Sequence, residues 1–207
     1  MKKKALFAII LGAALLNTGI PALTAGQAQA KKEAAKKETK PKCLEAVEFL
    51  TGFGWGQLHA IRNYNLYPLL VDFDFDLKPL LNKLNIRPPV LVQFQIEPFI
   101  SVISSPKTNI ETGTSFSLKI GLLPQTSKFQ PYIKAGAGLD YMTLHTGEQA
   151  TQFNFIEYGG AGIHYYFRKN TAITLEGRFR HLSNSGIDHP NHGINTYFAL
   201  AGITYQF

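Results

Sequence analysis

Apolar and polar side chains alternate with a period of two along most of the chain after residue 46. This period is typical of β-strands, in which successive side chains point to opposite faces. Eight segments show this alternation, and in the sixth of them, 151–168, Glu157 interrupts one face. An even number of antiparallel strands of this length, joined by short turns, is typical of outer-membrane β-barrels. The segments are 47–58, 64–77, 88–105, 112–124, 129–144, 151–168, 171–184 and 195–207.

A soluble β-sandwich or lipocalin-like barrel would show the same alternation, with its apolar face turned inward. Two further features favour the membrane. Tyrosines and phenylalanines such as Tyr64, Tyr67 and Tyr165 gather near strand ends, as the interfacial girdles of membrane barrels require. The last strand ends on Phe207, and an aromatic residue there resembles the sorting signal of outer-membrane barrels. We therefore expect an all-β fold, an eight-stranded antiparallel transmembrane β-barrel.

The polar face of such a barrel would point into its lumen. Eight strands leave a lumen only wide enough for side chains to fill, so charged side chains there must pair with one another. A filled lumen disfavours a porin. We therefore expect the function to lie on the outer wall or in the loops. The residues predicted to face the lumen are Asp72, Asp74, Asp76, Glu97, Lys119, Lys134, Asp140, Glu176, Arg178 and Arg180.

The N-terminal segment carries three lysines, an apolar run of 12 residues from Ala5 to Leu16, and a closing Ala28-Gln29-Ala30. This pattern is typical of a secretory signal peptide. A single-pass anchor is disfavoured, because a membrane-spanning helix needs about 20 residues. The next segment is rich in Lys, Glu and Ala and predicts a basic periplasmic tether. The predicted divisions are a signal peptide at 1–30, the tether at 31–46 and the barrel at 47–207.

The formal net charge of +7 belongs to the signal peptide and the tether. Residues 43–207 hold twelve basic and twelve acidic side chains, so the predicted barrel is neutral. Nucleic-acid binding therefore loses its main support. Cys43 is the only cysteine, so no intramolecular disulfide can form. We interpret it as an incidental thiol beside the barrel, with an intermolecular bridge as the alternative.

The end of the seventh predicted strand places polar side chains on the lipid-facing side. By parity, His181 and Ser183 share the outer face of this strand, and Asn195 shares that of the last strand. The turn between the two strands is extracellular, because both ends of an eight-stranded barrel lie on the periplasmic side. These side chains could simply contact lipid head groups, since polar residues near the interface cost little. They also fit nucleophilic acyl transfer, in which an imidazole takes the proton of a nearby hydroxyl.

The following loop contains Asp188, His189 and His192, which could suggest a metal site. Three polar residues on an extracellular loop are more often exposed to solvent or in contact with head groups. We therefore predict neither a metal nor another cofactor.

Residues 178–195 resemble the outer-membrane lipid A 3-O-deacylases, a family of eight-stranded, acyloxyacyl hydrolase-like barrels. The family patterns Arg-His-x-Ser-Asn-x-Gly and Pro-Asn-x-Gly appear as Arg180-His181-Leu182-Ser183-Asn184-Ser185-Gly186 and Pro190-Asn191-His192-Gly193. The resemblance implies Ser183 as nucleophile and His181 as general base. It also implies an oxyanion hole made by Asn184 and the backbone amide of Gly186.

The sequence departs from the best-known family members at the third triad position, where Asn195 replaces a glutamate. A carboxylate stabilises the imidazolium that forms during catalysis, and its replacement by an amide costs about 10⁴ in rate in a serine protease. Cys-His-Asn enzymes show that an amide can still orient the base. Asn195 is therefore compatible with activity, and the sequence leaves the rate open.

From this resemblance we expect an esterase that removes the 3-O-linked acyl chain of lipid A in the outer leaflet of a bacterial outer membrane. Lipopolysaccharide is the expected substrate, and a homodimer is possible. Two alternatives stay open. One is a non-catalytic small barrel with a structural or adhesive role, and the other is a degenerate deacylase that binds lipid A without turnover.

Overall fold

All eight predicted strands are present in the computed structural model, which describes residues 44–58 and 63–207. The predicted signal peptide, Cys43 and most of the predicted tether lie outside the described residues. The elements are β1 (Leu44–Gly56), β2 (Tyr64–Asp76), α2 (Lys78–Lys83), β3 (Val90–Ser105), β4 (Asn109–Pro124), β5 (Phe129–Met142), β6 (Phe153–Arg168), β7 (Thr171–Ser183) and β8 (Ile194–Gln206).

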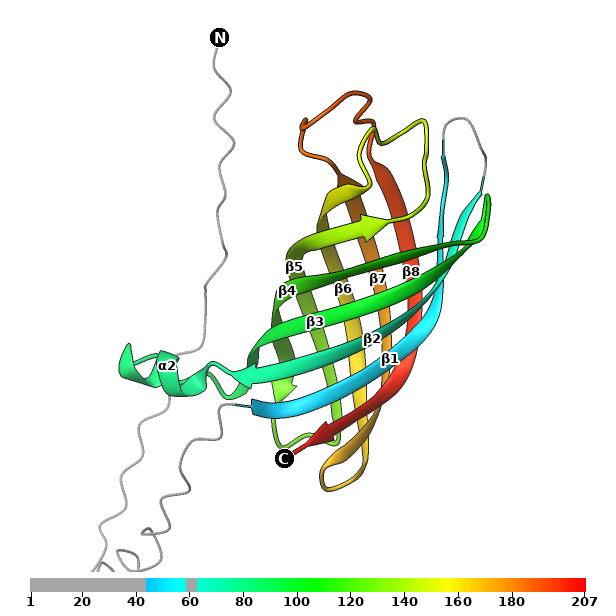
Figure 1. Ribbon diagram of the computed structural model, residues 1–207. Coiled ribbons are helices and arrows are strands. Elements are labelled where there is room, and N and C mark those ends of the chain that lie inside the picture. Colours follow the sequence, from blue (N-terminus) through cyan, green and yellow to red (C-terminus); the bar gives the residue numbers. More distant parts are fainter. Residues whose placement is uncertain (1–43, 59–62) are drawn as a thin grey trace, which may run out of the picture. The chain divides into compact units, whose positions relative to one another are not determined.

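The strands pair in chain order, and the sheet closes into a barrel where β1 pairs with β8. In this closing pair Val47 lies opposite Tyr205, and Trp55 lies opposite Tyr197. Figure 1 shows the β7–β8 connection at the end of the barrel opposite the C-terminus. Closure leaves the sheet without an unpaired edge, which is the condition for a sheet to span a membrane. The fold overturns the β-sandwich alternative.

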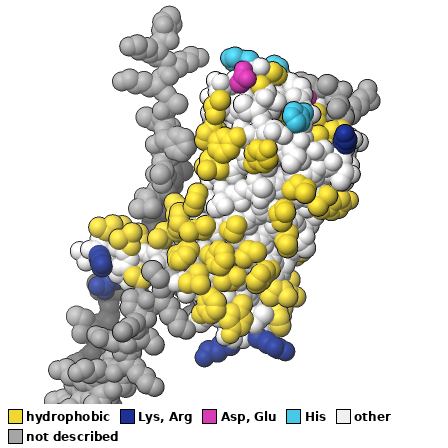
Figure 2. Space-filling model, in the orientation of Figure 1, with side chains coloured by type: hydrophobic (Ala, Val, Ile, Leu, Met, Phe, Trp, Pro, Cys, Tyr) yellow, Lys and Arg dark blue, Asp and Glu magenta, His cyan; other side chains and the backbone are white. Residues whose placement is uncertain are grey.

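Buried and exposed positions alternate along the strands, and the apolar side chains occupy the exposed set. On β7, Ile173 and Leu175 are exposed, whereas Thr174 and Glu176 are buried. Apolar side chains cover much of the outer wall in Figure 2, and charged side chains lie near its ends. A lipocalin-like soluble barrel would turn its apolar face inward, so this arrangement overturns the second soluble alternative.

The lumen is filled with paired charges, as the parity of the sequence predicted. Arg178 donates to Glu97 over 2.7 Å, and Lys134 lies 2.9 Å from Glu176. Asp140 departs from the prediction, because it is buried and neither of its carboxylate oxygens has a hydrogen-bond partner among the described residues. Further ion pairs among the described residues join Lys119 to Glu48 and Asp74, Lys134 to Asp72 and Glu97, Arg178 to Glu176, and Arg180 to Glu111.

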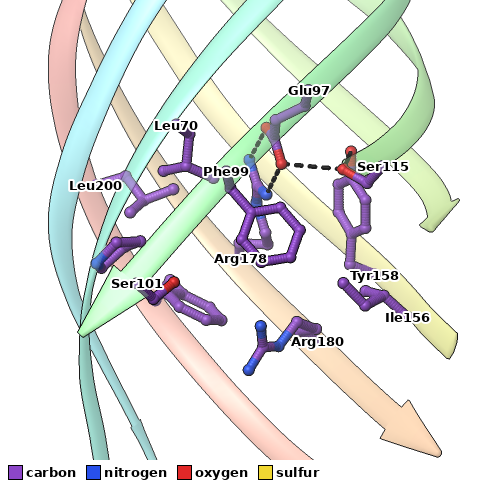
Figure 3. A pocket seen from close by; sticks show the side chains of 12 residues that line it. Leu70, Glu97, Phe99, Ser101, Ser115, Ile156, Tyr158, Arg178, Arg180 and Leu200 are labelled. Carbon is purple, nitrogen blue, oxygen red and sulfur yellow. Dashed lines mark hydrogen bonds and ion pairs between the residues drawn. The ribbon is translucent and has the colours of Figure 1, made fainter. Parts of the chain in front are cut away.

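Little space is left inside the barrel. Figure 3 shows a cavity beside the Glu97–Arg178 pair, and its volume of about 20 Å³ gives room for about one water molecule. Toward the β7–β8 loop the inward positions become apolar, and this cluster includes Leu66, Met142, Ile156, Leu182 and Ile194. A lumen filled by side chains disfavours a pore, so a site for chemistry must lie on the outer wall or the loops.

The start of β1 and the β2–β3 connection differ from the sequence prediction. β1 begins at Leu44, ahead of the predicted boundary at residue 47, because Leu44 pairs with Phe75 across a β-bulge. The β2–β3 connection is not a short turn but contains α2, whose first turn carries Pro79. Asp76, expected in the lumen, is only half-buried and accepts a hydrogen bond from the Lys78 backbone N–H. Among the described residues, no helix is long and apolar enough to cross a membrane.

Candidate active site

His181 and Asn195 lie directly opposite each other across the β7–β8 pair. Nδ1 of His181 lies 2.7 Å from Oδ1 of Asn195. An amide oxygen accepts hydrogen bonds, so Nδ1 donates its proton and the lone pair of Nε2 is left free. This tautomer is the one that a general base requires.

Ser183 follows His181 by two residues on β7 and shares its outward-facing side. Both side chains are half-buried, and Asn195 is exposed. Ser183 lies opposite Phe155 on β6. Among the described residues, no hydrogen bond joins Ser183 to His181. Catalytic hydrogen bonds are often long without substrate, so this geometry agrees with a base that acts only in a substrate complex.

Gly193, just before β8, lies against the ring of His181. A Cβ at this position would fall 2.4 Å from Cε1 of His181, and the backbone φ of +77° is left-handed. Only glycine combines this conformation with so close an approach. The Pro-Asn-x-Gly pattern contained this signal, but the sequence alone gave Gly193 no role.

Asn184 is buried, and its polar groups hold the β7–β8 loop together. Its side-chain amide donates to the backbone oxygen of Asp188 over 2.9 Å. Its Oδ1 accepts the Gly186 N–H, also over 2.9 Å. The two groups that the resemblance implies as oxyanion donors are therefore both engaged within the loop.

The β7–β8 loop is also tied to the β5–β6 loop. The backbone N–H of His192 donates to the oxygen of Glu148 over 2.9 Å, and Gln149 forms an isolated β-bridge with Asn191. Oε1 of Gln149 accepts the Asn184 N–H over 3.1 Å. Figure 1 shows these two loops side by side at one end of the barrel. This support could not be seen in the sequence, because the two loops are far apart along the chain.

Asp188, His189 and His192 are the loop residues that could suggest a metal site. Within the described ranges, no group of three or more His, Cys, Asp or Glu residues has the geometry to hold a metal ion. Oδ1 of Asp188 instead accepts the backbone N–H of His189 over 2.7 Å.

Aromatic side chains line the outer wall beside the His181–Asn195 pair. Tyr197 packs on Phe179 with 5.2 Å between ring centroids, and on Trp55 with 6.1 Å. An open groove of about 1010 Å³ borders Asn195, Gly193, Trp55 and Tyr197. A polar pair beside an apolar wall suits a substrate with both a polar ester and a hydrocarbon chain.

Known proteins share this fold. Among solved structures, the outer membrane enzyme PagL matches 78% of this chain and 99% of its own, with 17% identity and a TM-score of 0.55. Neisserial surface protein A (NspA) matches 78% and 96%, with 11% identity and a TM-score of 0.57. At such identities these likenesses show the fold alone.

No curated protein sequence is similar enough to match. A family profile described as lipid A 3-O-deacylase (PagL), however, matches residues 90–204, more than half of the chain. These residues include both halves of the His181–Asn195 pair. The chain therefore belongs to the lipid A 3-O-deacylase family of eight-stranded outer-membrane barrels.

Proposed function

We propose that this barrel hydrolyses the ester that joins the 3-O acyl chain to lipid A, with Ser183 as nucleophile and His181 as general base. The observation that carries the proposal is the 2.7 Å hydrogen bond between Nδ1 of His181 and Oδ1 of Asn195 on the outer wall. It holds the imidazole in the tautomer that leaves Nε2 free. Ser183 lies two positions further along the same face.

The reaction runs through an acyl-enzyme. Oγ of Ser183 attacks the ester carbonyl carbon while its proton passes to Nε2 of His181. The tetrahedral intermediate then expels the sugar 3-oxygen, which takes that proton from Nε2. Water attacks the acyl-serine, again with His181 as base, and releases the free hydroxy acid and the original serine.

The proposal keeps Asn184 and the Gly186 amide as donors to the oxyanion. Both donors are bonded inside the loop, to the backbone oxygen of Asp188 and to Oδ1 of Asn184. Substrate binding must therefore exchange at least one of these bonds for a bond to the oxyanion. In structures without substrate, catalytic hydrogen bonds are often poorly aligned and tighten only in the substrate complex.

The outer leaflet is the proposed place of reaction. His181 and Ser183 lie at the end of β7, and Asn195 lies at the start of β8. Figure 1 shows the β7–β8 connection at the end of the barrel away from the C-terminus. The C-terminal end of such a barrel faces the periplasm, so the loop end meets the leaflet that contains lipopolysaccharide. The apolar wall below the site, including Phe179 and Tyr197, suits the acyl chains.

Incubation of the refolded protein with purified lipopolysaccharide tests the proposal. Mass spectrometry should show the loss of one hydroxyacyl chain. Ser183→Ala and His181→Ala should each lower the rate by at least about 10³-fold. Ser185→Ala, which removes an exposed hydroxyl from the same loop, is the matched control and should leave the rate unchanged.

Three results would count against this function. Undiminished deacylation by Ser183→Ala would show that Ser183 is not the nucleophile. Binding of lipid A by the wild-type protein without turnover would favour the degenerate deacylase. A wild-type protein that neither binds nor deacylates lipid A would favour the structural or adhesive barrel.

A further inference from the structure

Glu157 is a carboxylate on the outer wall, directly opposite His181 across the β6–β7 pair. Its side chain is exposed and points to the same side as Phe153 and Tyr165. From Phe153 to Phe167 on β6, and along all of β7 and β8, no other outward-facing position carries a charge. This isolated charge is the feature that interrupts the apolar pattern of the sixth strand.

A charge on a lipid-facing wall is destabilising, and the cost falls toward the membrane interface. The neighbours of Glu157 offer it little compensation. Ala137 lies opposite on β5, and the next outward position along β6 is Gly159. Glu157 makes no hydrogen bond or ion pair with any described residue. Among its cross-strand neighbours, His181 is the one that can become positively charged.

His181 thus lies between two side chains of different character. On β8, Asn195 fixes the ring by a hydrogen bond but brings no charge. On β6, Glu157 brings a negative charge. Directly opposed side chains on neighbouring antiparallel strands have Cβ atoms about 4.5–5.5 Å apart, within reach of a flexible glutamate.

We propose that Glu157 supplies the negative charge that an amide at Asn195 cannot give. Glu157 acts as a positioning residue, because it stabilises the imidazolium of His181 while Nε2 holds the proton of Ser183. It takes no proton itself and does not touch the substrate. At the lipid interface the dielectric constant is low, so this attraction is stronger than it would be in water. The inference rests on the proposed roles of Ser183 and His181.

Other titratable groups lie on the elements that flank His181. On the outward face they are Tyr165 on β6 and Tyr197 and Tyr205 on β8, and the loop before β8 adds Asp188, His189 and His192. Asp188 is the only other carboxylate in this set, and it does not pair with β7. Asp188→Asn is therefore a matched control that removes one negative charge from the same end of the barrel.

The test uses the full refolded chain and two readouts. The first is the steady-state deacylation of lipopolysaccharide, and the second is the rate at which a fluorophosphonate labels Ser183. Glu157→Gln should lower kcat and the labelling rate about tenfold with KM unchanged, because only the charged transition state loses stabilisation. Glu157→Asp should recover part of the loss. Asp188→Asn should stay close to wild type in both readouts.

A double-mutant cycle sharpens the test. Asn195→Glu should raise kcat more in the Glu157→Gln background than in the wild type, because the two carboxylates serve the same imidazolium. An unchanged kcat and labelling rate in Glu157→Gln would overturn the inference. A change in KM alone would also overturn it, since that result indicates contact with the lipid.

The two proposals fail in different ways. A wild-type protein that is labelled but does not deacylate lipopolysaccharide would refute the proposed substrate, while the labelling rates would still test Glu157. A wild-type protein whose Ser183 is not labelled at all would overturn both.

Discussion

Gly193 lies against the imidazole of His181 so closely that a Cβ on this glycine would fall 2.4 Å from Cε1. We predict that Gly193→Ala displaces the ring from Asn195. A misplacement of about 1 Å in a catalytic group can cost about 10²-fold in rate, so kcat should fall by about that factor. Steady-state deacylation kinetics on the refolded variant measure the loss.

Gly186→Ala provides the control. Gly186 has a similar left-handed backbone, with φ at +78°, but no atom lies within 4 Å of the position that its Cβ would take. Both substitutions strain the backbone, and only Gly193→Ala meets the imidazole. Because the Gly186 N–H is a proposed oxyanion donor, the two variants are matched by their free energy of unfolding and not by rate. A Gly193→Ala variant that loses as much stability as Gly186→Ala but keeps the wild-type kcat would show that the contact with His181 does not matter.

Two substitutions of Asn195 should change kcat in opposite directions. Asn195→Ala removes the hydrogen bond that orients His181, so kcat should fall about tenfold. Asn195→Glu adds a charge beside the imidazolium and should raise kcat above wild type. An inactive wild-type protein whose Asn195→Glu variant deacylates lipid A would identify a degenerate enzyme. Identical rates in the wild type and both variants would show that Asn195 has no part in catalysis.

Reversal of a charge in the lumen should destabilise the barrel more than reversal of an exposed charge. Arg178 is buried and pairs with Glu97 and Glu176. Arg178→Glu removes the arginine partner of both carboxylates and adds a third carboxylate beside them, with Lys134 left as their shared cation. Breaking a buried pair costs about 3–5 kcal/mol. Lys169→Glu changes an exposed turn and should have a small effect. Denaturant unfolding in lipid vesicles compares the two, and equal effects would mean that the lumen tolerates unpaired charge.

Phe207 should contribute to assembly more than to the stability of the folded barrel. Its ring is exposed and packs on Tyr205 with centroids 5.4 Å apart, while its N–H bonds to the Glu45 oxygen. Deletion of Phe207 should lower the amount of heat-modifiable barrel in the outer membrane, and Phe207→Trp should restore it. Semi-native gels before and after boiling measure both. Normal assembly of the deletion would refute a sorting role.

The alternation of side chains by itself determined much of this fold. A period of two is a local property of a strand, so the eight segments and their two faces could be read from neighbouring residues. Parity also placed His181 and Ser183 on one outer face, and it placed Arg178 and Glu97 in the lumen. Where one face is buried, a slip by one residue would expose every charge, so parity constrains the barrel strongly.

The register between strands was decided only by the tertiary structure. Pairing depends on barrel closure and on the lengths of the connections, which no single strand encodes. This register puts Asn195 on one side of His181 and Glu157 on the other. Parity shows that Glu157 and His181 both face outward, but it cannot show that they are neighbours.

The hydrogen bonds of the loops likewise could not be predicted from the sequence and are seen only in the folded structure. Asn184 makes its contacts with Gln149 across two loops that are distant in sequence, and its buried position follows from them. The unpaired Asp140 and the helix α2 were not predicted for the same reason. Parity gives the face of a side chain, whereas its partners depend on which strands and loops the closed barrel brings together.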